Sequence, residues 1–229
     1  METLEKIRKA YTEYVLENGR QPISVFQFAK KLKLAEAEFY NHYASFDAIE
    51  ADIWLTFFQA SKQTVEADGT YQTYSVREKL LAFYYTWIEL LKAQRSFVVY
   101  SYGRFGPTSR RATDAGISPI TRAGARSRNA NSPVLMPFKE AFNDFARDLL
   151  AEGRESREVE PRPFLTDRYP AALWTQALFI LDFWVKDASK GFEKTDTAIE
   201  KSVNTTFDLI GRSPLDTLFD FAKFAYQNR

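Results

Sequence analysis

Cysteine is absent from this chain of 229 residues, and histidine occurs only once, at His42. Without cysteine the protein forms no disulfide and offers no thiolate as a nucleophile or metal ligand. A single histidine cannot build the usual zinc ligand sets, and the carboxylates show no pattern that pairs two of them. We therefore expect no catalytic residues, no metal and no cofactor, and we do not expect the protein to be an enzyme.

A long apolar run is also lacking. The longest one, residues 177–185, is interrupted by Asp182 and is too short to span a bilayer. The first 19 residues are charged and amphipathic, unlike the apolar core of a signal peptide. Together with the absence of cysteine, which suits a reducing compartment, these features predict a cytoplasmic protein with no membrane partner.

The net charge is close to zero, with 31 Lys and Arg against 30 Asp and Glu, but the basic residues are unevenly placed. Residues 103–130 hold six arginines and one aspartate, together with four glycines and two prolines. We interpret this segment as a long solvated loop. The alternative is that its arginines contact an anion or a nucleic acid.

Apolar residues recur at helical spacing through most of the chain, which predicts an all-α protein. Gly19 lies where a helix C-terminal cap belongs, and Ser24 with Gln27 and Ser75 with Glu78 have the spacing of capping boxes. The longer helices are expected at about 4–18, 24–32, 36–42, 46–65, 76–93, 133–153, 167–188, 195–210 and from 214 onward.

Residues 24–50, SVFQFAKKLKLAEAEFYNHYASFDAIE, predict two short helices joined by a tight turn, which is a helix-turn-helix pattern. The stretch resembles the signature of the TetR family of transcription regulators. Ser24 stands at the family's Thr or Ser cap, Phe28-Ala29 at its Ile-Ala, Phe39-Tyr40 at its Leu-Tyr, and His42-Tyr43 at its His-Phe. The resemblance implies an N-terminal three-helix helix-turn-helix domain, here 1–50. It also implies a larger helical bundle domain for ligand binding and dimerisation, here 51–229.

In that family the second helix of the motif enters the major groove and its N-terminal residues reach base edges. Tyr40 and His42 are then expected to contact a base or a phosphate, and Ser24 a phosphate. The residues that the resemblance places at the DNA are Ser24, Lys33, Ala35, Glu36, Ala37, Tyr40, Asn41 and His42.

Three positions depart from the family pattern. Lys33 replaces the glycine of the turn, Glu38 the threonine of the recognition helix, and Phe46 the lysine that opens the next helix. Because DNA affinity depends strongly on neutralised phosphates, two functions stay open. The first is a DNA-binding repressor. The second is a TetR-fold lipid-binding accessory protein that has lost DNA binding, which the amphipathic segment 215–226 would suit.

Aromatic residues make up 16% of the chain, which is more ring area than a small helical bundle packs easily. We expect some of the rings to line a pocket for an apolar small-molecule effector, between residues 76–102 and the helix at 167–188. The predicted lining is Phe83, Trp87, Tyr100, Phe179 and Phe183. The TetR resemblance also implies a homodimer formed through the helices at 167–188 and 195–211.

Overall fold

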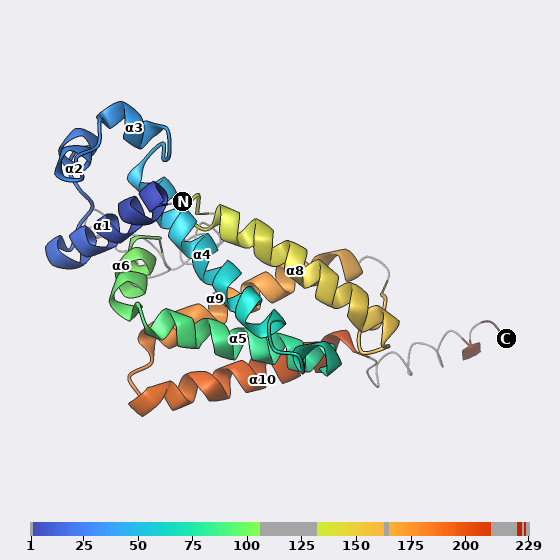
Figure 1. Cartoon of the computed structure of the whole chain (residues 1–229). Helices are drawn as coiled ribbons and strands as arrows, with labels where there is room; N and C mark the ends of the chain where they lie inside the picture. The colour runs from blue at the N-terminus through green and yellow to red at the C-terminus, as the bar shows by residue number, and fades with distance from the viewer. Residues whose placement is uncertain (1, 106–131, 163–164, 212–223, 226, 228–229) are drawn as a thin grey trace, which may run out of the picture. The chain divides into compact units, whose positions relative to one another are not determined.

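A computed structural model describes residues 2–105, 132–162, 165–211, 224–225 and 227. Within these ranges the chain forms helices and no strand, so the predicted all-α class is confirmed (Figure 1). The α-helices are α1 (Glu2–Asn18), α2 (Val25–Lys31), α3 (Glu36–Tyr40), α4 (Phe46–Glu66), α5 (Val76–Lys92), α6 (Arg95–Phe105), α8 (Met136–Glu155), α9 (Tyr169–Lys186) and α10 (Glu193–Ile210). Short 3-10 turns occupy Tyr71–Thr73, Thr166–Arg168 and Lys190–Phe192. None of the described helices combines the length and the apolar character needed to cross a membrane.

The chain divides into two compact units, each built from two separate stretches. The first comprises Met1–Ser61 and Trp87–Ala141, and the second comprises Lys62–Thr86 and Phe142–Arg229. The sequence placed a single domain boundary after residue 50, and that boundary stays a prediction. A division by packing can fall inside a helix, as it does in α4, α5 and α8, whereas sequence composition marks only linkers.

Local signals set several helix ends as the sequence predicted. Gly19 adopts φ +64° directly after α1 and donates its amide to the Val15 carbonyl at 2.9 Å. The Ser24 hydroxyl oxygen accepts from the Gln27 amide at 3.4 Å and starts α2. These contacts join residues three or four positions apart, so sequence spacing is sufficient to predict them.

Other boundaries differ from the prediction. α3 ends at Tyr40 rather than at 42, and α8 starts at Met136 because Ser132 and Leu135 first close a turn. The predicted loop from 103 is also shortened, since α6 continues to Phe105. The rest of that loop (106–130) and most of the predicted helix from 214 lie outside the described residues.

Candidate functional site

The helix-turn-helix is held together by a cluster of rings behind its exposed surface. Phe28 of α2 and Phe39 of α3 are both buried, with ring centroids 6.2 Å apart in an edge-to-face arrangement. Phe46, at the start of α4, lies 5.4 Å from Phe28 and 5.8 Å from Phe39, and it stacks on Tyr11 of α1 at 5.7 Å. Phe46 therefore replaces the family's lysine with a side chain that packs the motif, which sequence reasoning did not foresee.

The predicted DNA-contact residues lie on the surface of the motif. Phe39 is fully buried, so at about 3.6 residues per turn Ala37 and Asn41 point to the opposite side of α3. Glu36 and Tyr40 occupy one flank of that exposed side. The exposed candidates are Lys33, Ala35, Glu36, Ala37, Tyr40, Asn41 and His42, whereas Ser24 is half-buried as the cap of α2.

The turn between α2 and α3 contains a non-glycine residue in the left-handed region. Lys33 has φ +58°, and the following Leu34 amide donates to the Ala29 carbonyl at 3.0 Å. Only glycine reaches this conformation without a steric penalty, which explains why a glycine suits the turn. The lysine keeps the same backbone path and adds a positive charge beside α3.

Lysines near the motif are partly engaged in local contacts. The Lys6 ammonium donates to the Leu32 carbonyl at 3.0 Å, and the Lys31 ammonium lies 5.4 Å from the centre of the Tyr14 ring. Lys30 and Lys33 are exposed. The cations are thus gathered at the end of α2 and in the turn rather than on α3.

Behind the motif, the fully buried carboxylate of Glu50 on α4 joins three helices. It accepts from the Tyr11 hydroxyl of α1 at 2.5 Å and from the Ser101 hydroxyl of α6 at 2.6 Å, and it contacts the Arg104 guanidinium of α6. Ser101 in turn accepts from the Trp54 indole at 3.0 Å. Burial and the nearby Glu50 raise the pKa of Tyr11 well above its usual value, so its hydroxyl stays protonated as the donor.

Arg104 completes this network by pairing with a second carboxylate. Its guanidinium donates to Asp47 at 2.8 Å, and the Gln21 amide donates to the same Asp47 oxygen at 2.8 Å. Burial alone would raise the pKa of Asp47, but the two donors outweigh burial and hold that pKa below its usual range. This network was not predicted from the sequence. The one feature that could have indicated it is Glu50, a carboxylate beside the buried Ile49 on the apolar face of α4.

The five residues predicted to line an effector pocket do not line the same pocket. Phe83 and Trp87 are fully buried. The Phe83 ring lies 4.9 Å from Phe145 in the second unit, and the Trp87 ring lies 5.5 Å from Phe138 in the first. Both side chains are therefore packed in the core of their own unit. Tyr100, on α6, is half-buried, and burial followed by the charge of Glu50 raises its pKa.

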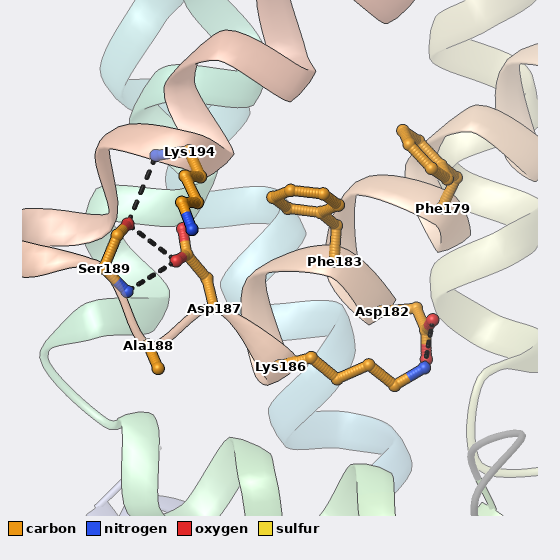
Figure 2. A pocket seen from close by; sticks show the side chains of 8 residues that line it. All are labelled: Phe179, Asp182, Phe183, Lys186, Asp187, Ala188, Ser189 and Lys194. Atoms are coloured by element: carbon orange, nitrogen blue, oxygen red, sulfur yellow. Dashed lines mark hydrogen bonds and ion pairs between the residues drawn. The ribbon is translucent and has the colours of Figure 1, made fainter.

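Phe179 and Phe183 instead line a surface pocket of about 470 Å³ in the second unit. Figure 2 shows both rings on one side of α9, with the Lys186–Asp182 ion pair beside them. The complete lining is Phe179, Asp182, Phe183, Lys186, Asp187, Ala188, Ser189 and Lys194, and it includes none of the other predicted pocket residues.

Asp187 of this pocket has a structural role at the start of α10. Its carboxylate accepts from the Ser189 amide at 2.8 Å and from the Thr195 amide at 2.9 Å, and from both hydroxyls. Burial opposes ionisation, but these four donors outweigh it and lower the pKa of Asp187 to about 2. Among the residues with described positions, no group of three His, Asp or Glu side chains is placed to hold a metal ion.

An all-α chain with a short N-terminal helix-turn-helix ahead of longer helices has the organisation of a helix-turn-helix regulator. Comparison with known proteins agrees. Residues 120–225 match the family described as tetracyclin repressor-like, C-terminal domain. No curated protein has a significant sequence match to the chain.

Two solved structures from Rhodococcus RHA1 have a similar fold. One is a bacterial regulatory protein in the TetR family, with 13% identity and a TM-score of 0.50 over 93% of this chain and 99% of that one. The other is a protein of unknown function, with 12% identity and a TM-score of 0.52 over 91% and 95% of the two chains. The C-terminal half of the chain is therefore similar to the tetracyclin repressor-like C-terminal domain, and the fold of the chain is similar to that of these two structures.

Proposed function

We propose that the protein is a TetR-type transcriptional repressor, located in the cytoplasm, that binds operator DNA as a homodimer and responds to an apolar small molecule. The main support is the construction of the N-terminal motif. Phe28 and Phe39 bury one side of α2 and α3, and the opposite side of α3 is left exposed. A helix presented in this way fits the major groove.

The proposed DNA contacts divide into two kinds. Glu36 and Ala37 on α3, and Ala35 and Asn41 at its two ends, are exposed and would meet base edges. The remaining candidates, Ser24, Lys33, Tyr40 and His42, carry groups that suit phosphate oxygens. Phosphate contacts position the protein, and base contacts give specificity.

The homodimer is proposed to form through α9 and α10, which pack on each other within the second unit. The outer face of α9 is poor in charge. Phe179 is 49% exposed there, and Asp182 and Lys186 neutralise each other as an ion pair. The other exposed residues of this face are small: Ala171, Ala172 and Thr175. Such a face can pack closely on its own copy about a two-fold axis.

The effector is proposed to bind in the C-terminal helical domain, at the surface pocket of about 470 Å³ whose lining includes Phe179 and Phe183. Supporting this assignment, the Phe179 and Phe183 rings lie 6.1 Å apart and offer an apolar surface to a ligand. An effector acts only if it binds the DNA-competent and DNA-free conformations with different affinity. Apolar compounds that bind would raise the melting temperature of the protein by mass action.

The deciding experiment is fluorescence anisotropy with the DNA that flanks the protein's own gene, titrated over a range of salt concentrations. We expect specific binding with a shallow salt dependence, because few cations lie on the exposed motif surface. Tyr40→Ala and His42→Ala should weaken binding while leaving the circular dichroism spectrum unchanged. Tyr85→Ala on α5, which removes another exposed tyrosine outside the motif, serves as the matched control.

A second candidate function is a TetR-fold lipid-binding accessory protein without DNA binding. It is favoured by the acidic side chains Glu36 and Glu38 on α3 and by two exposed apolar residues at the start of α2, Ile23 (76% exposed) and Phe26 (55%). Absence of DNA binding even at low salt, together with lipid co-purifying with the protein, would support this candidate over the repressor.

A further inference from the structure

The outward surface of α3 presents an unusual set of chemical groups. Its centre is the methyl group of Ala37, opposite the buried Phe39, and the carboxylates of Glu36 and Glu38 lie on its two flanks. All three side chains are exposed. Residues 35–42 contain no lysine or arginine, so the N-terminal half of α3 offers carboxylate acceptors and methyl groups.

Each base presents a distinct pattern in the major groove. Guanine offers two acceptors, which arginine or lysine contacts with paired donors, whereas cytosine offers the N4 amino group as a donor. An ionised glutamate can only accept hydrogen bonds, so it matches cytosine and is repelled by the guanine acceptors. The Ala37 methyl matches the 5-methyl group of thymine, which is the apolar feature of the groove.

We propose, on the basis of the DNA-binding function above, that α3 selects an operator half-site whose contacted strand carries cytosine and thymine. Glu36 and Glu38 accept hydrogen bonds from cytosine N4 amino groups, and Ala37 packs on a thymine methyl group. The lysines at the end of α2 and in the turn, Lys30 and Lys33, supply phosphate contacts that carry no sequence information. The base preference then comes from the side chains of α3, and the phosphate contacts of the lysines contribute affinity for any sequence.

The two glutamates could serve only the helix, since acidic side chains in a first turn stabilise it through the helix dipole. Glutamine separates the two roles because it keeps the shape of glutamate and removes the charge. A glutamine at a recognition position pairs with adenine through two hydrogen bonds. A glutamate that only stabilises the helix would leave base preference unchanged when it is replaced.

The test is selection of bound duplexes from a randomised DNA library, using the full-length protein and its Glu36→Gln and Glu38→Gln variants. The native protein should enrich cytosine at the contacted positions, and each variant should change one of these positions to adenine. The affinity ratio between the two bases should change by roughly 5- to 100-fold. Glu17→Gln, an exposed glutamate on α1, makes the same charge change outside the motif and should leave the selected sequence unaltered.

Replacing thymine by deoxyuridine in the selected site removes only the methyl group, and should weaken binding of the native protein several-fold but have little effect on Ala37→Gly. Identical selected sequences for the native protein and both glutamine variants would overturn the inference and leave DNA binding intact. Enrichment of A·T pairs by the native protein at the positions that the glutamine variants change would do the same. Failure of the native protein to bind any duplex at low salt would instead overturn the proposed function itself.

Discussion

The Arg104 guanidinium on α6 contacts the fully buried carboxylate of Glu50 on α4, across 54 residues of sequence. The same carboxylate accepts from Tyr11 on α1, so one charged group connects the helix that precedes the motif with two helices that follow it. A buried charge is stable only when its hydrogen-bonding capacity is filled. The relative positions of α1, α4 and α6 are therefore coupled through Glu50.

Replacing Arg104 by methionine should destabilise the protein markedly. The substitution removes the cation and leaves Glu50 buried with only neutral donors, which should cost about 2–4 kcal/mol of unfolding free energy. The measurement is urea unfolding followed by tryptophan fluorescence. Adding Glu50→Gln to this variant should recover part of the loss, because the uncompensated charge is then removed as well.

Arg147→Met provides the matched control, since Arg147 pairs with Asp144 and both side chains are largely exposed. Its effect should stay below about 1 kcal/mol. Equal losses for Arg104→Met and Arg147→Met would show that the Glu50 network contributes nothing beyond an ordinary surface pair.

Lys33→Gly should stabilise the fold and weaken DNA binding at the same time. Lys33 has φ +58°, a conformation that costs a residue with a Cβ about 1–2 kcal/mol and costs glycine almost nothing. Part of this gain is offset by the greater chain entropy of glycine, so a net gain of about 0.5–1 kcal/mol is expected. Losing one phosphate contact should reduce the slope of log affinity against log salt by about one.

Lys30→Gly is the companion variant, because Lys30 lies inside α2 and glycine there should destabilise the helix by about 1 kcal/mol. The two lysines have the same charge and differ in backbone conformation. If both variants shift stability in the same direction, the left-handed turn is not the source of the strain.

Asp187→Asn should lower stability in a manner that depends on pH. The folded-state pKa of Asp187 is about 2, below its ordinary value of 3.8, so the ionised cap stabilises the folded state fully above about pH 4. That contribution is lost as pH falls from about 4 toward 2. The variant should be less stable than the native protein by about 1–3 kcal/mol at neutral pH, with the difference narrowing below pH 4.

Thermal unfolding at a series of pH values measures this difference. Asp182→Asn serves as the control, because Asp182 forms an ion pair with the exposed Lys186 on the surface of α9. A constant difference between Asp187→Asn and the native protein from pH 7 to pH 3 would contradict the assigned role of the carboxylate.

Phe179→Glu should disrupt the homodimer without unfolding the subunit. The Phe179 ring is about half exposed and lies 6.1 Å from Phe183 on the outer face of α9, so a charge there remains accessible to water in the monomer and becomes buried in a dimer. Sedimentation velocity at micromolar concentration should show a dimer for the native protein and a monomer for the variant. Leu16→Glu on α1, a comparably exposed apolar position, should remain dimeric. A Phe179→Glu dimer would place the interface elsewhere.

Helix ends were predictable wherever the deciding contact is local. The Ser75 amide donates to the Glu78 carboxylate at 2.8 Å and the Glu78 amide donates to the Ser75 hydroxyl at 3.3 Å, as the spacing of a capping box requires. Phe46 shows the opposite case. Its identity suggested a lost phosphate contact, but the half-buried Phe46 ring packs against the rings of Tyr11, Phe28 and Phe39, which three other helices contribute.

The sequence by itself determined the helical class, the caps and the exposed face of α3, because each depends on residues within about one helical turn of one another. It could also show that Phe83 and Trp87 share one helix face, as do Phe179 and Phe183. Only the tertiary structure decided that the first pair is buried and the second pair lines a surface pocket. Periodicity states which residues share a face, whereas burial depends on which faces of distant helices meet. For the same reason, the pairing of Glu50 with Arg104 could be recognised only in the folded chain.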